Sequence, residues 1–297
     1  MEQVLVLTSA GPLDDERADA ARLALSRVAV AAPAPRRLAF DAVEIGFEGP
    51  REAALAAVRA AIAGAAVDVN AVPADNRRKR ILICDMDSTI IPVECIDEIA
   101  DFAGVKDRVS TITEKAMRGE IDFDGALRER VALLAGLPET VLQRVYDERI
   151  SLNPGARRMV ATMAAVGAEA ALVSGGFTFF TSRVAKAAGF NRHQANELLT
   201  NDGALTGEAG APILGREAKR RALLAIAAEI GADPVDAVAV GDGANDLDMI
   251  RAAGLGVAYR AKPAVAEAAD ARLDHSDLSA VLRLQGFADD EDAALTP

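Results

Sequence analysis

The sequence predicts an α/β protein: a doubly wound parallel sheet that carries an inserted helical segment, preceded by a smaller α+β domain. Three short apolar runs, 81–84, 168–173 and 235–240, have the continuous Val, Ile, Leu and Ala content of buried parallel strands. Between the first two runs, residues 95–150 carry apolar residues only at helical spacing. A strand, a wholly helical stretch and then further strand–helix units together indicate that the helices are an insertion into the sheet domain.

Residues 1–75 are predicted to form the smaller domain, because strands and helices alternate there in the order of a ferredoxin-like sandwich. We expect a strand at 4–7, an Ala-rich helix at 14–30, a hairpin or bent strand at 38–47, a helix at 50–62 and a strand at 67–72. The basic run Arg77–Arg80 follows, and four like charges predict a solvated connector rather than a nucleic-acid patch.

The rest of the chain divides into a core, residues 76–94 and 151–297, and a helical cap, residues 95–150. Cap helices are expected at 96–102, 109–117, 123–134 and 140–150, separated by turns that contain glycine. Core helices are expected at 156–166, 177–188, 219–230 and 247–253, and a hairpin at 197–207 with Asp202-Gly203 as its turn.

Composition limits the classes of function. A formal net charge of −12 and a pI of about 4.8 oppose nonspecific binding to nucleic acid or to an anionic membrane, so neither partner is expected. No stretch of the sequence reaches the roughly 20 apolar residues needed to span a bilayer, and the N-terminus lacks a basic signal region. The two cysteines, Cys84 and Cys95, support neither a disulfide framework nor a zinc cluster. The sequence therefore predicts a cytoplasmic protein.

The first apolar run ends on two carboxylates, Asp85 and Asp87, followed by the hydroxyls of Ser88 and Thr89. Ligand sites of open α/β sheets lie at the carboxyl ends of the strands. Two neighbouring carboxylates repel unless a cation or a shared proton compensates, so the pair indicates a metal site or an acid–base partnership. The alternative is an Asx-type turn that caps the next helix, which needs only one aspartate.

Two further strands end in the same way. The second apolar run leads into Ser174-Gly175-Gly176, whose hydroxyl and backbone N–H groups could hold an anion, although a turn that needs positive φ is the alternative. The third leads into the segment Gly241–Asp246, which contains Asp242 and Asn245. Lys219 is one of three cations in the first turn of a helix, where they oppose the macrodipole, so at least one of the three is expected to have a specific role. Because parallel strands end at one edge, these groups can meet as ligands for Mg²⁺ and for phosphate oxygens.

Four blocks of the sequence resemble, in order, the four motifs of the haloacid dehalogenase superfamily of phosphatases. The blocks are Asp85–Thr89, Ser174-Gly175, Lys219 and Gly241–Asp246. The resemblance implies a Rossmann-like core. Within the superfamily, the chain is similar to the enzymes that hydrolyse O-phospho-L-serine in serine biosynthesis. The narrower resemblance rests on the continuation to Glu94, on the segments 117–123 and 127–131, and on the form Val173–Phe177. Residues 1–75 look only weakly like the ACT-type regulatory domain of some bacterial members.

The resemblance implies a role for each matched residue. Asp85 would be the nucleophile and Asp87 the general acid and base. Mg²⁺ would bind the carboxylates of Asp85 and Asp242 and the backbone carbonyl of Asp87. The phosphoryl oxygens would contact Ser174, Gly175 and Lys219, with Asn245 lining the same pocket. Finally, Glu94 would pair with the substrate ammonium, Arg130 with its carboxylate, and Phe123 with its apolar stem.

The residues themselves leave alternatives open. Glu94 could cap the helix that begins at Cys95, Arg130 could be a surface cation, and Phe123 could belong to the core. The chain could also act on another small phosphate ester, transfer the phosphoryl group to an alcohol, or serve chiefly as an amino-acid sensor through residues 1–75. A homodimer is an open option.

Overall fold

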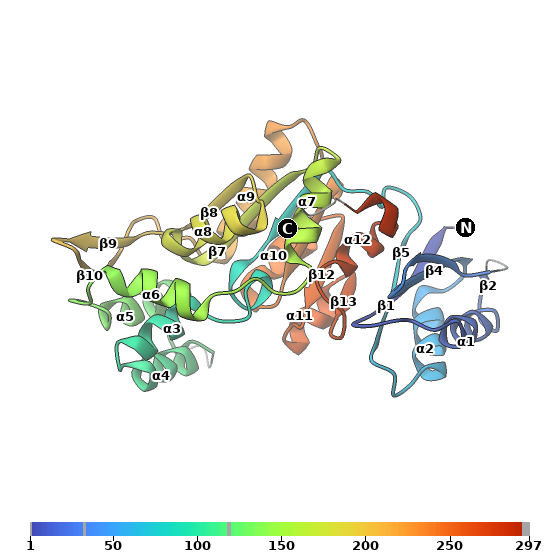
Figure 1. The fold of residues 1–297 in the computed structure, drawn as a ribbon, viewed down its shortest axis with the longest axis horizontal. Helices are drawn as coiled ribbons and strands as arrows, with labels where there is room; N and C mark the ends of the chain where they lie inside the picture. Colours follow the sequence, from blue (N-terminus) through green and yellow to red (C-terminus); the bar gives the residue numbers. More distant parts are fainter. Residues whose placement is uncertain (1, 32–33, 118–119, 293–297) are drawn as a thin grey trace.

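The computed structural model describes residues 2–31, 34–117 and 120–292, and it contains a parallel sheet domain, a helical cap and a separate N-terminal sheet (Figure 1). The N-terminal sheet has the order β2-β4-β1-β5, with β3 also paired to β4. Every pair is antiparallel, which is the predicted ferredoxin-like arrangement. Its elements are β1 (Gln3–Ser9), α1 (Asp15–Leu25), β2 (Val30–Ala31), β3 (Arg36–Ala39), β4 (Ala42–Glu48), α2 (Arg51–Ala61) and β5 (Val67–Pro73).

The middle of strand β1, residues 4–7, is apolar because both of its faces are covered. Side chains alternate across a strand, so Leu5 and Leu7 point to one face and Val4 and Val6 to the other. The two leucines pack in a cluster with residues of α1 and α2. The two valines belong to the main core of the larger domain. The N-terminal sheet is therefore packed between its own helices and the rest of the chain.

The second sheet is parallel and has the order β13-β12-β11-β6-β7-β8. This confirms the predicted α/β fold class. The three strands expected from the apolar runs occupy adjacent positions at its centre, and the strand β12 beside them was also expected, at residues 255–259. Strands β8 and β13 were not predicted from the sequence. The strands are β6 (Ile81–Cys84), β7 (Glu169–Phe177), β8 (Arg192–Asn196), β11 (Ala237–Gly241), β12 (Leu255–Tyr259) and β13 (Ala271–Leu273).

Helices cover both faces of this sheet. Leu82 and Cys84 of β6 face a core built with α7, α8 and α12, whereas Ile81 and Ile83 face a core built with α9, α10 and α11. The helices are α7 (Ala156–Ala165), α8 (Thr178–Ala188), α9 (Arg216–Glu229), α10 (Leu247–Ala252), α11 (Pro263–Ala268) and α12 (Ala280–Leu284). This double coverage explains the unbroken apolar runs from which the strands were predicted.

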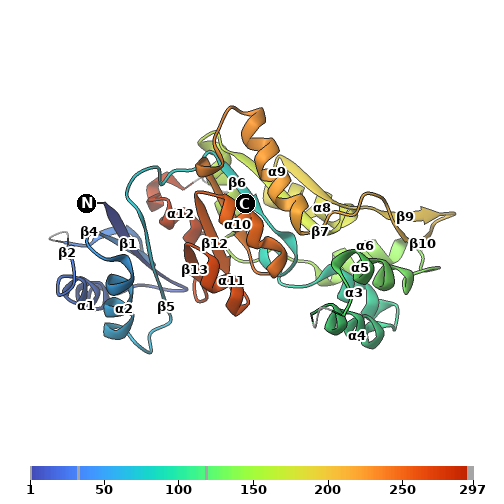
Figure 2. The same cartoon turned by 180° about the vertical axis from the view of Figure 1, so that it is seen from behind.

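In the described part of the cap there are four helices. They lie beside the parallel sheet domain (Figures 1 and 2). They are α3 (Cys95–Phe102), α4 (Lys106–Met117), α5 (Phe123–Ala132) and α6 (Thr140–Arg149). The predicted hairpin, β9 (Leu198–Asn201) and β10 (Ala204–Ala209), reaches across to them. Leu205 exchanges backbone hydrogen bonds of 2.8 Å with Gly136 and Leu137, so this hairpin packs with the cap helices although it follows β8 in the chain.

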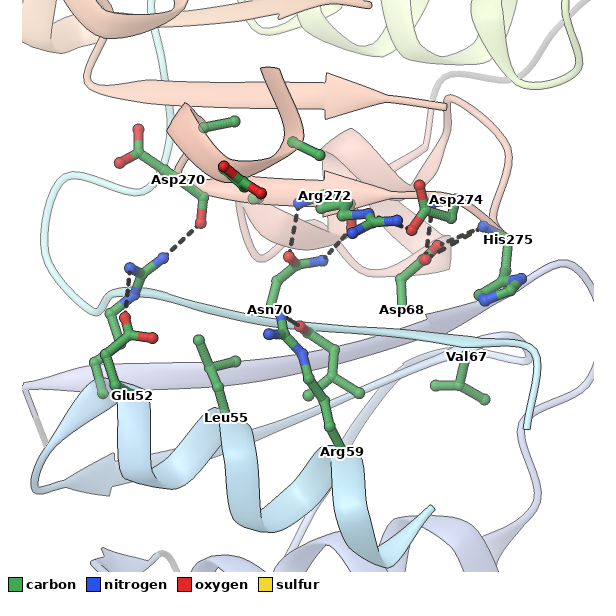
Figure 3. Close-up of a pocket in the computed structure, with 16 residues that line it drawn as sticks. Glu52, Leu55, Arg59, Val67, Asp68, Asn70, Asp270, Arg272, Asp274 and His275 are labelled. Atoms are coloured by element: carbon green, nitrogen blue, oxygen red, sulfur yellow. Dashed lines mark hydrogen bonds and ion pairs between the residues drawn. The ribbon is translucent and has the colours of Figure 1, made fainter. Parts of the chain in front are cut away.

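The N-terminal sheet is attached to the parallel sheet along β5 and β13 (Figure 3). The carboxylate of Asp68 is buried and accepts hydrogen bonds from the backbone N–H groups of residues 274, 275 and 276. The side-chain amide of Asn70 donates to the backbone carbonyl of Arg272 and accepts from its N–H. It thus makes the pair of hydrogen bonds that a neighbouring strand would make. Side chains thus join the edges of the two sheets.

The basic run after the first domain is not a solvated connector, which corrects the sequence-based expectation. Arg77 pairs with Glu44 at 2.8 Å and also donates to backbone carbonyls of α12. Arg78 pairs with Glu291, and the buried Lys79 donates to the carbonyl of Val235. These cations hold the start of the core against its C-terminal segment. Across the described ranges, no helix is long and apolar enough to cross a membrane.

Candidate active site

The predicted site residues that follow the central strands come together at one edge of the parallel sheet. Asp85 follows β6, Ser174 lies in β7 and Asp242 follows β11, and these three strands are direct neighbours. The N–H of Asp85 still donates to Val240 of β11 at 3.0 Å, which fixes the two acidic strand ends relative to each other. The predicted convergence of these strand ends therefore occurs.

The chain turns sharply after β6. The carboxylate of Asp85 accepts the N–H of Met86 at 2.7 Å, Asp87 has an extended backbone, and Ser88 adopts a left-handed conformation with φ of 55°. The Ser88 hydroxyl donates to Glu94 at 2.6 Å. Glu94 is the N-cap residue of α3, as the alternative expected, but its side chain makes no capping hydrogen bond to the helix. The turn presents the side chains of Asp85 and Asp87 at the strand end.

Lys219 lies between two buried carboxylates. Its Nζ is 2.6 Å from Oδ2 of Asp85 and 2.5 Å from Oδ1 of Asp246, and its side chain is only 2% exposed. Oδ2 of Asp246 also accepts the N–H groups of Asp242 and Gly243, at 3.1 and 3.0 Å. The sequence analysis gave Asp246 no role of its own, although it ends the segment Gly241–Asp246. Asp246 both holds the lysine and shapes the loop that carries Asp242.

Three of these carboxylates could hold a metal ion. Asp85, Asp242 and Asp246 each offer an oxygen, and these oxygens lie within 4.8 Å of one another. Burial and the charge of Asp246 raise the pKa of Asp242 to about 6 and hold that of Asp85 well above its usual range. Crowded, partly desolvated carboxylates of this kind are favourable partners for a hard divalent cation, which relieves their repulsion. The donor set therefore fits Mg²⁺.

Asp87 is suited to proton transfer near neutral pH. Burial and the charge of Glu94 raise its pKa to about 7, although hydrogen bonds from Cys95 oppose the shift. The Cys95 N–H, at the start of α3, donates to its Oδ1 at 3.3 Å. A carboxyl group with a pKa near the working pH can both give and take a proton.

The glycines after Ser174 are required for space. Gly176 donates its N–H to the Ser174 hydroxyl at 2.8 Å. A Cβ on Gly176 would lie 2.8 Å from the carboxylate of Asp87, and one on Gly175 would lie 3.0 Å from the ring of Phe123. Neither glycine has a positive φ, and β7 runs through both of them. The alternative of a positive-φ turn is therefore wrong, and a close approach of side chains explains the two glycines.

A cavity of about 440 Å³ joins this strand edge to the cap. Its core side includes Asp85, Asp87, Ser174, Gly175, Asp242 and Asn245, and its cap side includes Glu94, Phe123 and Arg130. Lys219 is buried beneath this surface. The structure thus brings all the predicted site residues together around one cavity. Arg118 and Gly119, which contributed to the narrower resemblance, lie outside the described residues.

Arg130 faces the cavity rather than open solvent, so the alternative of a surface cation is wrong. Its Nε donates to the carbonyl of Ala126, and burial lowers its pKa. Within the described ranges its two terminal nitrogens have no hydrogen-bond partner. Asp97 and Lys262 also line the cavity, and the sequence analysis singled out neither. Both lie outside the motif blocks, so only the folded arrangement reveals them.

The family model for haloacid dehalogenase-like hydrolases matches residues 82–251, which include every predicted site residue. The chain belongs to this family. It is 47% identical over 210 residues to a phosphoserine phosphatase of Albidiferax ferrireducens, covering 69% of this chain and 89% of that protein. A solved phospho-aspartyl intermediate analogue of phosphoserine phosphatase has 39% identity and a TM-score of 0.65, covering 69% of this chain and 98% of its own.

One of the similar solved structures aligns with nearly the whole length of this chain. A HAD family hydrolase of Salmonella enterica serovar Typhi has 27% identity and a TM-score of 0.85, and the alignment covers 96% of this chain and 98% of that one. Coverage of this extent includes the N-terminal sheet as well as the core and the cap. The arrangement of both sheets is therefore shared with a solved structure.

Proposed function

We propose that this chain hydrolyses O-phospho-L-serine to L-serine and phosphate with the help of Mg²⁺. One observation carries the proposal: a single cavity is lined by carboxylates and a hydroxyl from the strand ends, with a buried lysine paired beneath them, and also by Glu94 and Arg130. Phosphoserine carries a phosphate, an ammonium and a carboxylate, and the cavity offers a matching group to each. The similar curated proteins named phosphoserine phosphatase support the same substrate.

Two residues of the chain perform the bond changes. A carboxylate oxygen of Asp85 attacks phosphorus while the bond to the serine oxygen breaks, and Asp87 gives that oxygen its proton. This step releases serine and leaves an aspartyl phosphate. Asp87, now ionised, then takes a proton from water, whose oxygen attacks phosphorus and frees Asp85 and inorganic phosphate. The pKa of about 7 at Asp87 suits both of its roles.

The metal would be held by the carboxylates of Asp85 and Asp242 and by the backbone carbonyl of Asp87. When bound, it supplies positive charge that offsets the charge of the phosphoryl oxygens. Asp246 also lies within reach, but it accepts three hydrogen bonds, two from backbone N–H groups and one from Lys219. Asp85 is less engaged, because it accepts one backbone N–H and pairs with Lys219. We therefore assign Asp246 to holding Lys219 rather than to the metal.

The remaining groups bind and orient the substrate. Ser174, the N–H of Gly175 and Lys219 hold the phosphoryl oxygens, and Asn245 lines the same end of the cavity. At the cap end, Glu94 pairs with the ammonium and Arg130 with the carboxylate. Phe123, which lies against Gly175, contacts the carbon stem between them. A cap that closes over the core would keep bulk water from the reacting phosphorus.

We also propose a division of the chain into an ACT-like domain of residues 1–75, a core of residues 76–94 and 151–297, and a cap of residues 95–150. The hairpin formed by β9 and β10 would move with the cap, because its backbone hydrogen bonds reach residues 136 and 137. The cytoplasmic location and the homodimer stay predictions of the sequence.

The test is phosphate release from a panel of small phosphate esters, with Mg²⁺ and then with a chelator. We expect phosphoserine to be the preferred ester and the chelator to abolish its turnover. Replacing Asp85 with Asn should remove turnover and leave the circular dichroism spectrum unchanged, because the amide has nearly the same shape. Asp202→Asn, in the hairpin turn, is the matched control and should retain activity. Turnover by the Asp85 variant would contradict the nucleophile assignment, and phosphoryl transfer to an added alcohol would indicate a phosphotransferase.

A further inference from the structure

The cap wall of the cavity carries an acidic residue beyond those assigned above. Asp97 lies in the first turn of α3, three residues after Glu94, and it lines the same cavity. Residues three apart on a helix are neighbours on its surface, so these two carboxylates belong to one patch of the wall. Arg130 lines the cavity near them.

Among the residues that the structure describes, the carboxylate of Asp97 is stabilised only by the charges of Arg130 and Lys106, neither of which forms an ion pair with it. It accepts no hydrogen bond there, and no cation lies within 4.0 Å of it. Burial raises its pKa, and the charge of Glu94 raises it further, while Arg130 and Lys106 act in the opposite direction. A half-buried carboxylate beside another acid is unfavourable unless a cation arrives. Its surroundings therefore favour a positively charged group in the cavity.

Charge balance in the filled cavity points to the same group. If Glu94 alone paired with the ammonium and Arg130 alone with the carboxylate, Asp97 would face the substrate with no cation of its own. An ammonium has three N–H donors and can bond two carboxylates at once. Glu94 already accepts the Ser88 hydroxyl at 2.6 Å, which leaves room for a second acceptor to share the ammonium.

We propose that Asp97 and Glu94 together form the seat for the ammonium group, so that Asp97 is a specificity-determining residue for amine-bearing phosphate esters. This inference rests on the proposed function, because it concerns the cap end of the same cavity. Asp97 contacts the part of the substrate that does not react. It selects among phosphate esters by the positive charge that they carry.

Substrates that separate the two charged groups test this role. Phosphoserine has an amine and a carboxylate, phosphoethanolamine has only the amine, and phosphoglycolate has only the carboxylate. For Asp97→Asn we expect kcat/KM to fall about 10- to 30-fold for the two amine-bearing esters, mainly through KM, as loss of one charge-assisted hydrogen bond would cause. Phosphoglycolate, followed as a substrate or as a competitive inhibitor, should change less than about twofold, because it lacks the group that Asp97 binds.

The control is Glu98→Gln, on the same helix, since Glu98 lies 3.8 Å from Arg149 and does not line the cavity. It should leave all three esters unaffected. If Asp97→Asn lowered kcat/KM only for the carboxylate-bearing esters, Asp97 would act through Arg130, and the proposal would be overturned. Equal losses of kcat/KM on all three esters would overturn it as well. If the wild type turned over phosphoethanolamine but not phosphoserine, the proposed function would fail. The role of Asp97 would still be decided by comparing the effect of Asp97→Asn on amine-bearing esters with its effect on amine-free esters.

Discussion

Replacement of Lys219 with methionine should destabilise the protein in a pH-dependent way. The lysine is buried between Asp85 and Asp246, at 2.6 and 2.5 Å. Methionine has a similar length but no charge, so the variant leaves two carboxylates facing each other without a cation. Removing one partner from a buried ion pair costs about 3–5 kcal/mol, because the remaining charge stays out of water.

The size of the destabilisation follows from the proton that one of the two carboxylates must take up. Without the lysine, one of them must take up a proton, which from a usual pKa of 3.8 costs roughly 5 kcal/mol at pH 7.5 and roughly 2 kcal/mol at pH 5.5. The loss of the ammonium also removes its own desolvation cost. We therefore expect a net loss of about 3 kcal/mol at pH 7.5 and about 1 kcal/mol at pH 5.5.

The sign of the pH dependence comes from the carboxylates. Burial alone would lower the pKa of Lys219, but Asp246 and Asp85 raise it above its ordinary value of 10.5. A cation whose pKa is raised on folding contributes its full stabilisation below the unfolded pKa, so the wild-type lysine stays charged throughout this pH range. Asp87 and Asp242 titrate near this pH range in wild type and variant alike. The difference between the two proteins therefore comes from the carboxylates that lose the lysine, because protonation relieves their repulsion as the pH falls.

The assay is urea unfolding of wild type and variant at both pH values, with a chelator present. Lys186→Met, at an exposed position of α8, is the matched control and should change the free energy of unfolding by less than about 0.5 kcal/mol. A loss below about 1 kcal/mol at pH 7.5, or equal losses at the two pH values, would refute the reasoning about the buried cluster. Hydrolysis of phosphoserine by the variant should fall at least about 100-fold, because the lysine pairs with Asp85, the proposed nucleophile.

Three further expectations follow from the site and the sheet contact. Arg130→Ala should raise KM for phosphoserine about 10- to 100-fold and leave an ester without a carboxylate nearly unchanged, and equal losses on the two esters in steady-state kinetics would remove Arg130 from recognition. Since the pKa of Asp242 is raised to about 6, its carboxylate is protonated at lower pH, so Mg²⁺ affinity measured by calorimetry should fall about tenfold per pH unit below that value and stay nearly constant above pH 7. Asp68→Ala leaves three backbone N–H groups without their acceptor and should lower the free energy of unfolding by about 2–4 kcal/mol in urea, whereas Asp75→Ala, at an exposed position, should not.

The sequence was most informative about the middle of the parallel sheet. Strands β6, β7 and β11 are buried on both faces, so their apolar runs stand out from the surrounding helices. The edge strands β8 and β13 were missed because they lack such runs: β8 is Arg-His-Gln-Ala-Asn and β13 is only three residues long. Since the site lies at the centre of the sheet, the strands that carry it were the predictable ones.

Long-range contacts account for most of what the sequence could not reveal. The run Arg77–Arg80 looked like a solvated connector, yet its partners lie about 30 to more than 200 residues away, at Glu44, Val235, α12 and Glu291. The packing of hairpin β9–β10 on the cap is a contact of the same kind. Neither residue spacing nor composition specifies which distant group meets a cation. Such partners require the folded chain.

One long-range pair did leave a local signal in the sequence. In α9, Lys219 lies four residues before Leu223 and seven before Ile226, which places a cation in the apolar stripe that packs on the sheet. Arg220 and Arg221, its neighbours in the chain, are exposed. Burial of a lysine at such a position is tolerated only when carboxylates meet it, so the stripe predicts buried acidic partners even though it cannot name them. Asp85 and Asp246 both come from motif blocks, but Asp246 could be assigned as the second partner only after the turn Ala244–Asp246 had been placed beside α9.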